Sequence, residues 1–165
     1  MIFVTIGSAV KGIEFTRLIQ KMDEVARNTK EEVIMQIGTA PYEPQHTAFF
    51  RYCSYQDILE YFKRASLIVG HCGTGTILNA LKFEKPIIVV PRRIKYGELN
   101  RDDHQVEIAR KIEGNPLVHV VYEIEDLENA IKTIRGGIGA ASGSGSFPGR
   151  EKLIETIKNF VKMVG

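Results

Sequence analysis

Residues 65–91 read ASLIVGHCGTGTILNALKFEKPIIVVP, and this stretch decides the fold. A short apolar run, Leu67–Val69, leads through a glycine into the small and polar segment His71–Thr76. Apolar residues then recur at helical spacing until Pro86, and Ile87–Val90 forms a second apolar run. The order strand, glycine-rich turn, helix, strand predicts a βαβ unit of a parallel sheet. In such sheets ligands bind at the carboxyl ends of the strands, where this turn would lie.

The glycine-rich turn indicates a site for an anion, most simply a phosphate. The start of a helix offers unpaired N–H groups and the positive end of a dipole, and glycine lets a ligand approach the backbone closely. A P-loop is disfavoured because Thr76 stands where the phosphate-binding lysine belongs. A dinucleotide fingerprint is disfavoured because Gly7–Gly12, the turn after the first strand, lacks the middle glycine. The alternative is a tight turn that needs glycine only for its geometry.

The rest of the chain alternates between apolar runs and amphipathic segments. Further strands are expected at residues 2–6, 33–37, 49–53 and 117–121, and helices at residues 15–26, 57–64, from 102 onward and 126–135. This alternation predicts an α/β fold of the Rossmann-like, doubly wound type. The sheet should hold about six parallel strands in the order 3-2-1-4-5-6, with helices on both faces.

Composition divides the chain into three segments. Residues 1–135 hold the alternation of strands and helices and are expected to form one domain. Residues 136–149 are nearly all glycine, serine and alanine, which is typical of a flexible loop. Residues 150–165 carry an apolar stripe at helical spacing, which predicts an amphipathic helix that packs on the domain or on a partner.

The bulk properties disfavour several classes of protein. With 165 residues the chain has the size of one ordinary domain, and a net charge of +2 argues against nucleic-acid binding as its main task. Two cysteines make no disulfide framework and suit a reducing cytoplasm. The sequence has no recognisable signal peptide and no apolar run of membrane-spanning length, so a cytoplasmic location is expected.

Several motifs together resemble one enzyme family. They are HCGTGTILN at residues 71–79, KPIIVVP at residues 85–91, DHQ at residues 103–105 and the opening IFVTIG at residues 2–7. The combination resembles the C-terminal, donor-binding domain of family 28 glycosyltransferases, which have the GT-B fold. It is similar to the small UDP-GlcNAc transferase subunits of the dolichol pathway and to PssE-type exopolysaccharide transferase subunits. The resemblance covers residues 1–111, roughly two thirds of the chain.

The resemblance implies a function. A GT-B enzyme works in the cleft between two Rossmann-like halves, and this chain resembles the donor half alone. It would be the donor-binding catalytic subunit of a two-chain hexosyltransferase that moves GlcNAc or another hexose from a UDP-sugar to a lipid-linked acceptor. The transfer would be inverting and would need neither metal nor cofactor. A membrane-associated partner would supply the acceptor-binding half and the general base, and would recruit the chain to the membrane surface.

The resemblance also assigns roles to residues. His71 would donate to the diphosphate, Tyr55 would lie at the uracil edge, and Asn79 would face the ribose. Because the family usually has glutamate at the position of Asn79, the neutral amide implies weaker ribose recognition or a different nucleotide. Arg92 would attract the anionic donor, and His104 and Gln105 would bond sugar hydroxyls. The complete donor-binding set is Gly7, Ser8, Tyr55, His71, Gly73, Thr74, Gly75, Thr76, Asn79, Arg92, His104 and Gln105.

Each assignment has an ordinary structural alternative. His71 would close the hydrogen bonding between strand and turn, Thr76 would cap the helix, and Tyr55 would pack in the core. Arg92 and Gln105 would lie on a solvated surface. No metal site is expected, because no spaced cluster of histidine, cysteine and aspartate accompanies the turn.

Three other functions compete with transfer of a sugar. A non-catalytic nucleotide-sugar-binding or regulatory subunit is favoured by Asn79. A UDP-sugar epimerase shares the fold but normally needs both halves in one chain. An NAD-type oxidoreductase would suit the sheet but not the turn after the first strand.

Overall fold

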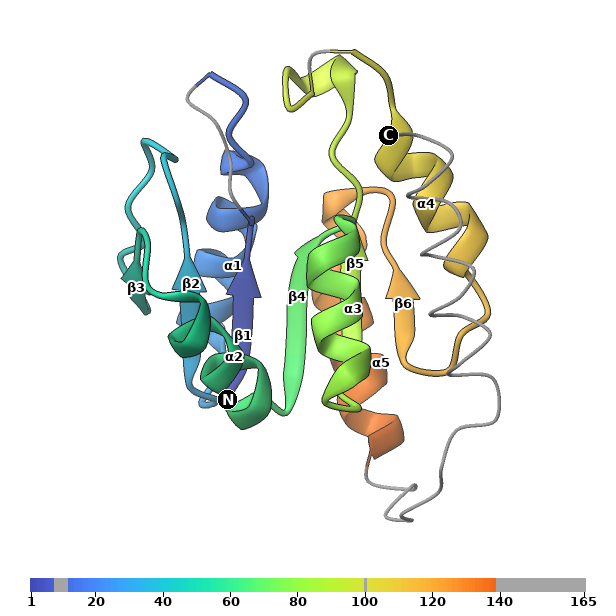
Figure 1. The fold of residues 1–165 in the computed structure, drawn as a ribbon. Coiled ribbons are helices and arrows are strands. Elements are labelled where there is room, and N and C mark those ends of the chain that lie inside the picture. Colours follow the sequence, from blue (N-terminus) through green and yellow to red (C-terminus); the bar gives the residue numbers. More distant parts are fainter. Residues whose placement is uncertain (8–11, 100, 139–165) are drawn as a thin grey trace.

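A six-stranded parallel sheet forms the centre of the molecule (Figure 1). The computed structural model describes residues 1–7, 12–99 and 101–138. Its strands follow the order β3-β2-β1-β4-β5-β6, so the predicted order is confirmed. The strands are β1 (Ile2–Thr5), β2 (Val33–Gln36), β3 (Ala48–Phe50), β4 (Leu67–His71), β5 (Ile87–Val90) and β6 (Val118–Val120).

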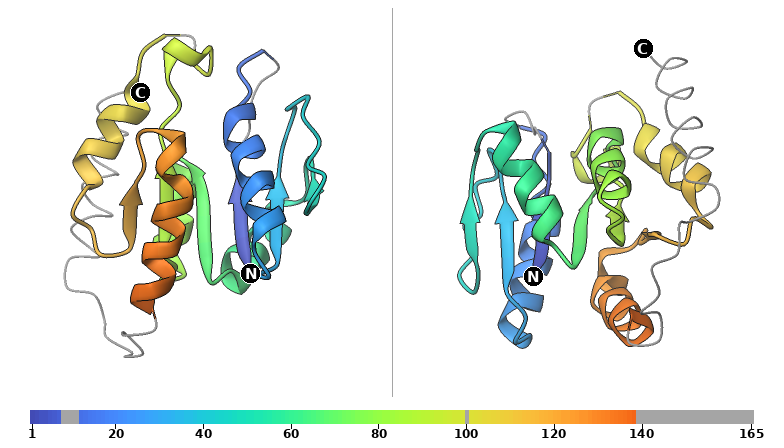
Figure 2. Two further views of the ribbon diagram at one scale, coloured as in Figure 1. Left: turned by 180° about the vertical axis from the view of Figure 1, so that it is seen from behind. Right: turned by 60° about the horizontal axis from the view of Figure 1, so that its bottom comes forward.

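Helices cover both faces of the sheet (Figures 1 and 2), which confirms the doubly wound α/β class. On one face lie α1 (Thr16–Asn28) and α5 (Leu127–Ile138). On the other face lie α2 (Tyr55–Arg64), α3 (Thr74–Lys82) and α4 (His104–Ile112). Two short 3-10 helices, η1 (Ile94–Tyr96) and η2 (Ile124–Asp126), follow β5 and β6.

The alternation of side chains along β1 divides the core into two parts. Ile2 and Val4 pack with α1 and α5, whereas Phe3 packs with the helices of the other face. The Phe3 ring stacks on Tyr61 of α2 with 5.2 Å between the ring centroids. Because both faces of the sheet are covered, its central strands are apolar almost throughout, which is why uninterrupted apolar runs predicted them.

The boundaries of several elements differ from those expected. β3 ends at Phe50 instead of residue 53, and its register with β2 ends at the pair of Gln36 and Phe50. α2 begins two residues early, since Ser54 caps it by accepting a hydrogen bond from the backbone of Asp57 at 3.1 Å. α5 continues to Ile138, into the segment expected to be a flexible loop. The remainder of that loop and the expected helix at residues 150–165 lie outside the described residues.

Within residues 1–7, 12–99 and 101–138, no helix combines the length and the apolar character that crossing a bilayer requires.

A buried carboxylate fastens the loop after β2 to α1. Asp23 is only 2% exposed, and it accepts hydrogen bonds from the backbone of Gln45 at 3.0 Å and of His46 at 2.8 Å. The hydroxyl of Tyr42 donates a further bond at 2.7 Å. Burial by itself raises the pKa of Asp23, but these hydrogen bonds outweigh it and hold the pKa below its ordinary value.

We expect Asp23→Asn to lower the free energy of unfolding by about 2 kcal/mol at neutral pH. The hydrogen-bond donors of Tyr42, Gln45 and His46 would then face a neutral amide in place of a carboxylate. A carboxyl whose pKa is lower in the folded state contributes stability above its unfolded pKa of about 3.9 and loses it as the pH falls further. The difference between wild type and variant should therefore shrink below about pH 4. Urea unfolding at pH 7, 5, 4 and 3 measures it. Glu24→Gln, which removes an exposed carboxylate one position along, is the control and should change stability by less than about 0.5 kcal/mol. An undiminished difference at pH 3 would contradict the role given to Asp23.

Candidate functional site

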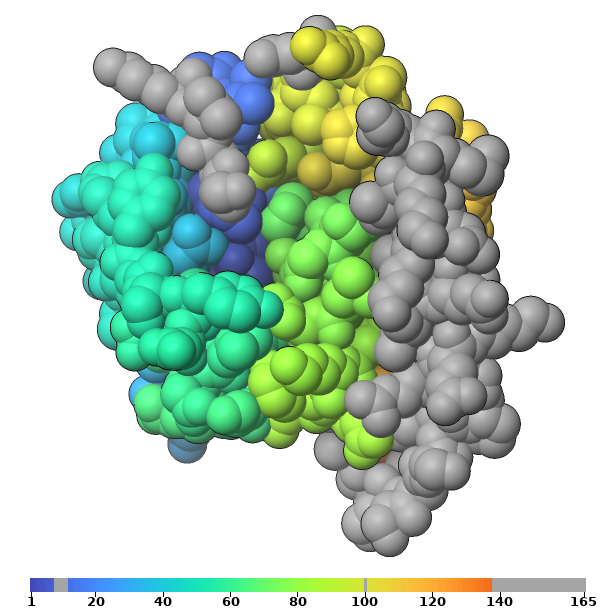
Figure 3. Space-filling model, viewed as in Figure 1, coloured from blue at the N-terminus to red at the C-terminus, as the bar shows by residue number. Residues whose placement is uncertain are grey.

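A pocket of about 510 Å³ opens at the carboxyl ends of the central strands. Figure 3 shows it as a hollow between α2 and α3, with atoms of β1 at its floor. The structure brings eight of the twelve predicted site residues to this pocket. They are Gly7, Tyr55, His71, Gly73, Thr74, Gly75, Thr76 and Asn79.

The first turn of α3 supplies unpaired backbone donors to the pocket. Its N-cap is Gly73, which has no side chain to accept a hydrogen bond, and its first helical bond runs from Ile77 N to Gly73 O at 3.1 Å. The N–H groups of the three residues between them therefore precede the helical hydrogen-bond ladder. All three of these residues line the pocket, so the helix directs its positive end into it. This geometry suits a phosphate.

The imidazole of His71 lies between Gly7, which follows β1, and Gly73, which follows β4. A Cβ atom on Gly73 would lie 2.2 Å from Nε2 of the ring, and one on Gly7 would lie 2.5 Å from Cε1. Gly7 also has a positive φ of 67°, which favours glycine independently of space. Both glycines are therefore needed for the ring to occupy its place. The turn after β1 and the turn after β4, far apart in sequence, meet through this one side chain.

His71 is neutral at physiological pH. Removal from water, followed by the positive charge of Arg92, lowers its pKa to about 3, against an opposing hydrogen bond to the backbone of Thr5. The hydroxyl of Thr76 lies 3.5 Å from Nδ1. A neutral imidazole carries a single N–H, so the ring can donate either to the Thr5 carbonyl or to a ligand, and it brings no charge.

Polar groups from two strands, β1 and β2, form the floor beside His71. Thr5 donates to the side-chain oxygen of Gln36 at 2.6 Å and accepts from the backbone of Gly7 at 3.2 Å. Gln36 in turn donates to the Gly7 carbonyl at 3.1 Å. Gly7 is thus held through both its N–H and its carbonyl. This fixed arrangement means that the pocket exists before a ligand enters.

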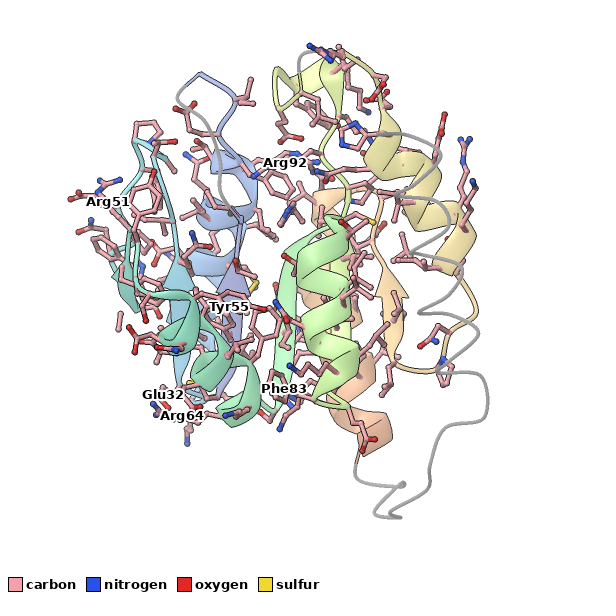
Figure 4. All side chains as sticks on the ribbon, in the orientation of Figure 1. Glu32, Arg51, Tyr55, Arg64, Phe83 and Arg92 are labelled. Atoms are coloured by element: carbon pink, nitrogen blue, oxygen red, sulfur yellow. The ribbon has the colours of Figure 1, made fainter. Side chains whose placement is uncertain are left out.

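The outer end of the pocket is aromatic and polar. Tyr55 is 64% exposed, so the expectation that it packs in the core is wrong. It lies between α2 and α3 (Figure 4), and its hydroxyl is 3.4 Å from the side-chain oxygen of Asn79. Tyr52, 59% exposed, lines the same end. Exposed aromatic rings beside a neutral amide suit the face of a base and the hydroxyls of a sugar.

The model of the glycosyltransferase family 28 C-terminal domain matches residues 1–141, well beyond residue 111, where the resemblance seen in the sequence ends. This chain belongs to that domain family. The UDP-N-acetylglucosamine transferase subunit ALG13 of Eremothecium gossypii is 38% identical to the family 28 chain over 68 residues, which are 41% of this chain and 31% of that protein. The human subunit of the same name is 28% identical over 121 residues, 67% of this chain and 10% of that protein. This family 28 chain thus spans less than a third of the length of these curated relatives.

Solved structures share the fold of this family 28 domain. MurG of Acinetobacter baumannii has a TM-score of 0.59 at 14% identity, with 96% of this chain and 49% of that one covered. Os79 of O. sativa, solved in complex with UDP, has a TM-score of 0.60 at 13% identity, with 98% of this chain and 35% of that one covered. The family 28 domain therefore corresponds in fold to one part of larger GT-B glycosyltransferases.

Three predicted residues of the family 28 chain that the structure describes do not line the pocket. Arg92 is 6% exposed, so the alternative of a solvated loop face is wrong, and its side chain donates to the Ile6 carbonyl. Gln105 is 4% exposed, which excludes a surface position, and accepts a hydrogen bond from the backbone of Arg92 at 3.1 Å. His104 bonds Asp102 at 2.6 Å at the start of α4. Ser8 lies outside the described residues.

Sequence reasoning missed other residues of the family 28 pocket. Gln36 could have been found, because it stands at the end of a predicted strand and so at the ligand-binding edge. Tyr52 and Cys53 were assigned to a strand that in fact ends before them. The remaining missed residues are Thr5, Ile58 and Phe62. In the part of the chain that the structure describes, no three histidine, cysteine or acidic side chains gather as metal ligands.

Proposed function

We propose that this chain is the donor-binding catalytic subunit of a two-chain glycosyltransferase, which transfers GlcNAc or another hexose from a UDP-sugar to a lipid-linked acceptor. The observation that carries the proposal is the convergence of the uncapped start of α3 and the neutral His71 ring on one pocket. Backbone N–H groups and an imidazole donor can hold a diphosphate without a metal ion. The aromatic end of the pocket, with Tyr55 and Asn79, would hold the nucleoside.

The same donors would assist the departure of UDP. Negative charge develops on the diphosphate as the bond to the sugar breaks, and preorganised donors at that place stabilise it. Inversion at the sugar carbon requires a general base that activates the acceptor hydroxyl from the opposite face. No carboxylate is found among the described residues that line the pocket, and a histidine with a pKa of about 3 is too weak a base. The base is therefore assigned to a partner chain.

A partner also fits the relatives. The proteins from Eremothecium gossypii and human are named as subunits of a transferase. We propose that the partner is membrane-associated, binds the lipid-linked acceptor and brings this chain to the membrane surface. Neither nucleic acid nor a cofactor takes part in the proposed reaction.

The first experiment is calorimetric titration of the chain with UDP, UDP-GlcNAc and NAD. We expect binding of both uridine nucleotides and none of NAD. A transfer assay with and without the membrane-associated partner then tests the division into two chains, and activity is expected only with both. Full activity of the lone chain would overturn the two-chain proposal, and absence of UDP binding would overturn the donor site.

A second candidate is a non-catalytic subunit that binds the nucleotide sugar. It is favoured by Asn79, whose neutral amide offers weaker hydrogen bonds to a ribose than a carboxylate does. Binding of UDP combined with unchanged transfer by the partner when His71 is replaced would support this candidate over the first.

A further inference from the structure

Arg92 is a buried arginine behind the pocket. It follows β5, is 6% exposed and reaches toward the end of β1, where it donates a hydrogen bond to the Ile6 carbonyl. Figure 4 shows it between the α1 side of the sheet and the loop after β5. The guanidinium carbon lies 5.6 Å from the centroid of the Phe15 ring. The side chain thus packs against apolar surface and fastens the strand end from which the Gly7 turn departs.

The charge of Arg92 is only partly offset by the described residues around it. The nearby carboxylate of Glu98 is already held by Arg17, with contacts of 2.6 Å and 3.2 Å from Nε and a terminal nitrogen. Two guanidinium groups therefore share one carboxylate. Nε of Arg92 is buried and, within the described ranges, has no hydrogen-bond partner. A buried cation that has only a shared counter-charge is costly, so its presence calls for an explanation.

The explanation lies in the neighbouring pocket. Ile6, which Arg92 holds, directly precedes Gly7, and Gly7 lines the pocket and contacts the His71 ring. The charge of Arg92 also reaches His71, since it is one cause of the low pKa of that imidazole. An anion bound beside Gly7 and His71 would lie within the same field.

We propose that Arg92 is a positioning residue of the anion pocket, which fixes the end of β1 and supplies positive charge that a bound diphosphate neutralises. The nature of the anion rests on the proposed function. Because Arg92 itself is buried, solvent screens its charge less than that of a surface group, and the attraction can act without direct contact. It should therefore favour ligands in proportion to their negative charge, and a neutral nucleoside should gain nothing from it.

The ratio of the affinities for UDP and uridine, measured by NMR titration, tests this proposal. Arg92→Gln keeps a donor for the Ile6 carbonyl but removes the charge, and we expect the ratio to fall about tenfold. Arg92→Lys keeps the charge and should leave the ratio within about threefold of wild type. Arg93→Gln removes the same charge one position along, where the side chain pairs with Glu123 at 2.9 Å and does not line the pocket, and should leave the ratio unchanged.

A second measurement is NMR titration of His71, whose pKa should rise in Arg92→Gln but not in Arg93→Gln. If Arg92→Gln does not fold, Arg92→Met is measured in the same two ways. A wild-type chain that fails to bind UDP would overturn the proposed function. A wild-type chain that binds UDP, with an Arg92→Gln ratio equal to its own, would overturn the role of Arg92 alone.

Discussion

A Gly73→Ala variant is expected to lose about 100-fold in UDP affinity while remaining folded, which corresponds to the loss of two charge-assisted hydrogen bonds at about 1.5 kcal/mol each. The backbone at Gly73 has φ −93° and ψ 140°, a conformation that alanine adopts without strain. The nearest obstacle is the His71 ring, whose Nε2 would lie 2.2 Å from the new Cβ. The ring must leave its place, and the turn that presents the start of α3 must shift with it.

Calorimetric titration with UDP measures this loss. His71→Ala removes one N–H donor and should cost about tenfold, less than Gly73→Ala. The double variant should match His71→Ala, because the ring is the nearest group that the new Cβ meets. Gly75→Ala is the matched control for folding, since a Cβ there meets no atom within 4 Å. Its melting temperature should equal that of the wild type. If Gly73→Ala bound UDP with an affinity within threefold of wild type, the position of the His71 ring beside Gly73 would not be needed for binding.

Replacing Glu98 with glutamine is expected to lower the free energy of unfolding by about 3 kcal/mol or more, because it leaves buried guanidinium groups without a counter-charge. The Glu98 side chain is 4% exposed and binds Arg17 through both carboxylate oxygens. It also accepts a hydrogen bond from the backbone of Arg93 at 3.0 Å. The pair ties α1 to the loop after β5, so that loop should loosen as the pair breaks.

Urea unfolding of the two proteins at neutral pH measures the difference. Glu60→Gln is the control, because it breaks an exposed pair with Lys63 on α2 and should cost less than about 0.5 kcal/mol. Equal stabilities for Glu98→Gln and Glu60→Gln would show that the buried pair contributes no more than a surface one.

The sequence by itself determined the sheet, its strand order and the position of the glycine-rich turn. Each depends on local or periodic features: Leu67–Val69 and Ile87–Val90 are apolar throughout because both faces of the sheet are covered, and the glycines and threonines of the turn stand together in the chain. Eight of the twelve predicted site residues meet in one pocket for the same reason, since carboxyl ends of parallel strands share an edge.

Only the tertiary structure decided how these residues are arranged. Gly7 and Gly73 both make room for one imidazole, Arg92 is buried against Ile6, and Tyr55 faces the pocket instead of the core. Each fact joins segments far apart in the sequence. Packing between those segments decides whether a polar side chain is exposed to water, lines the pocket or is buried beneath it. Residue type and spacing alone do not encode that packing.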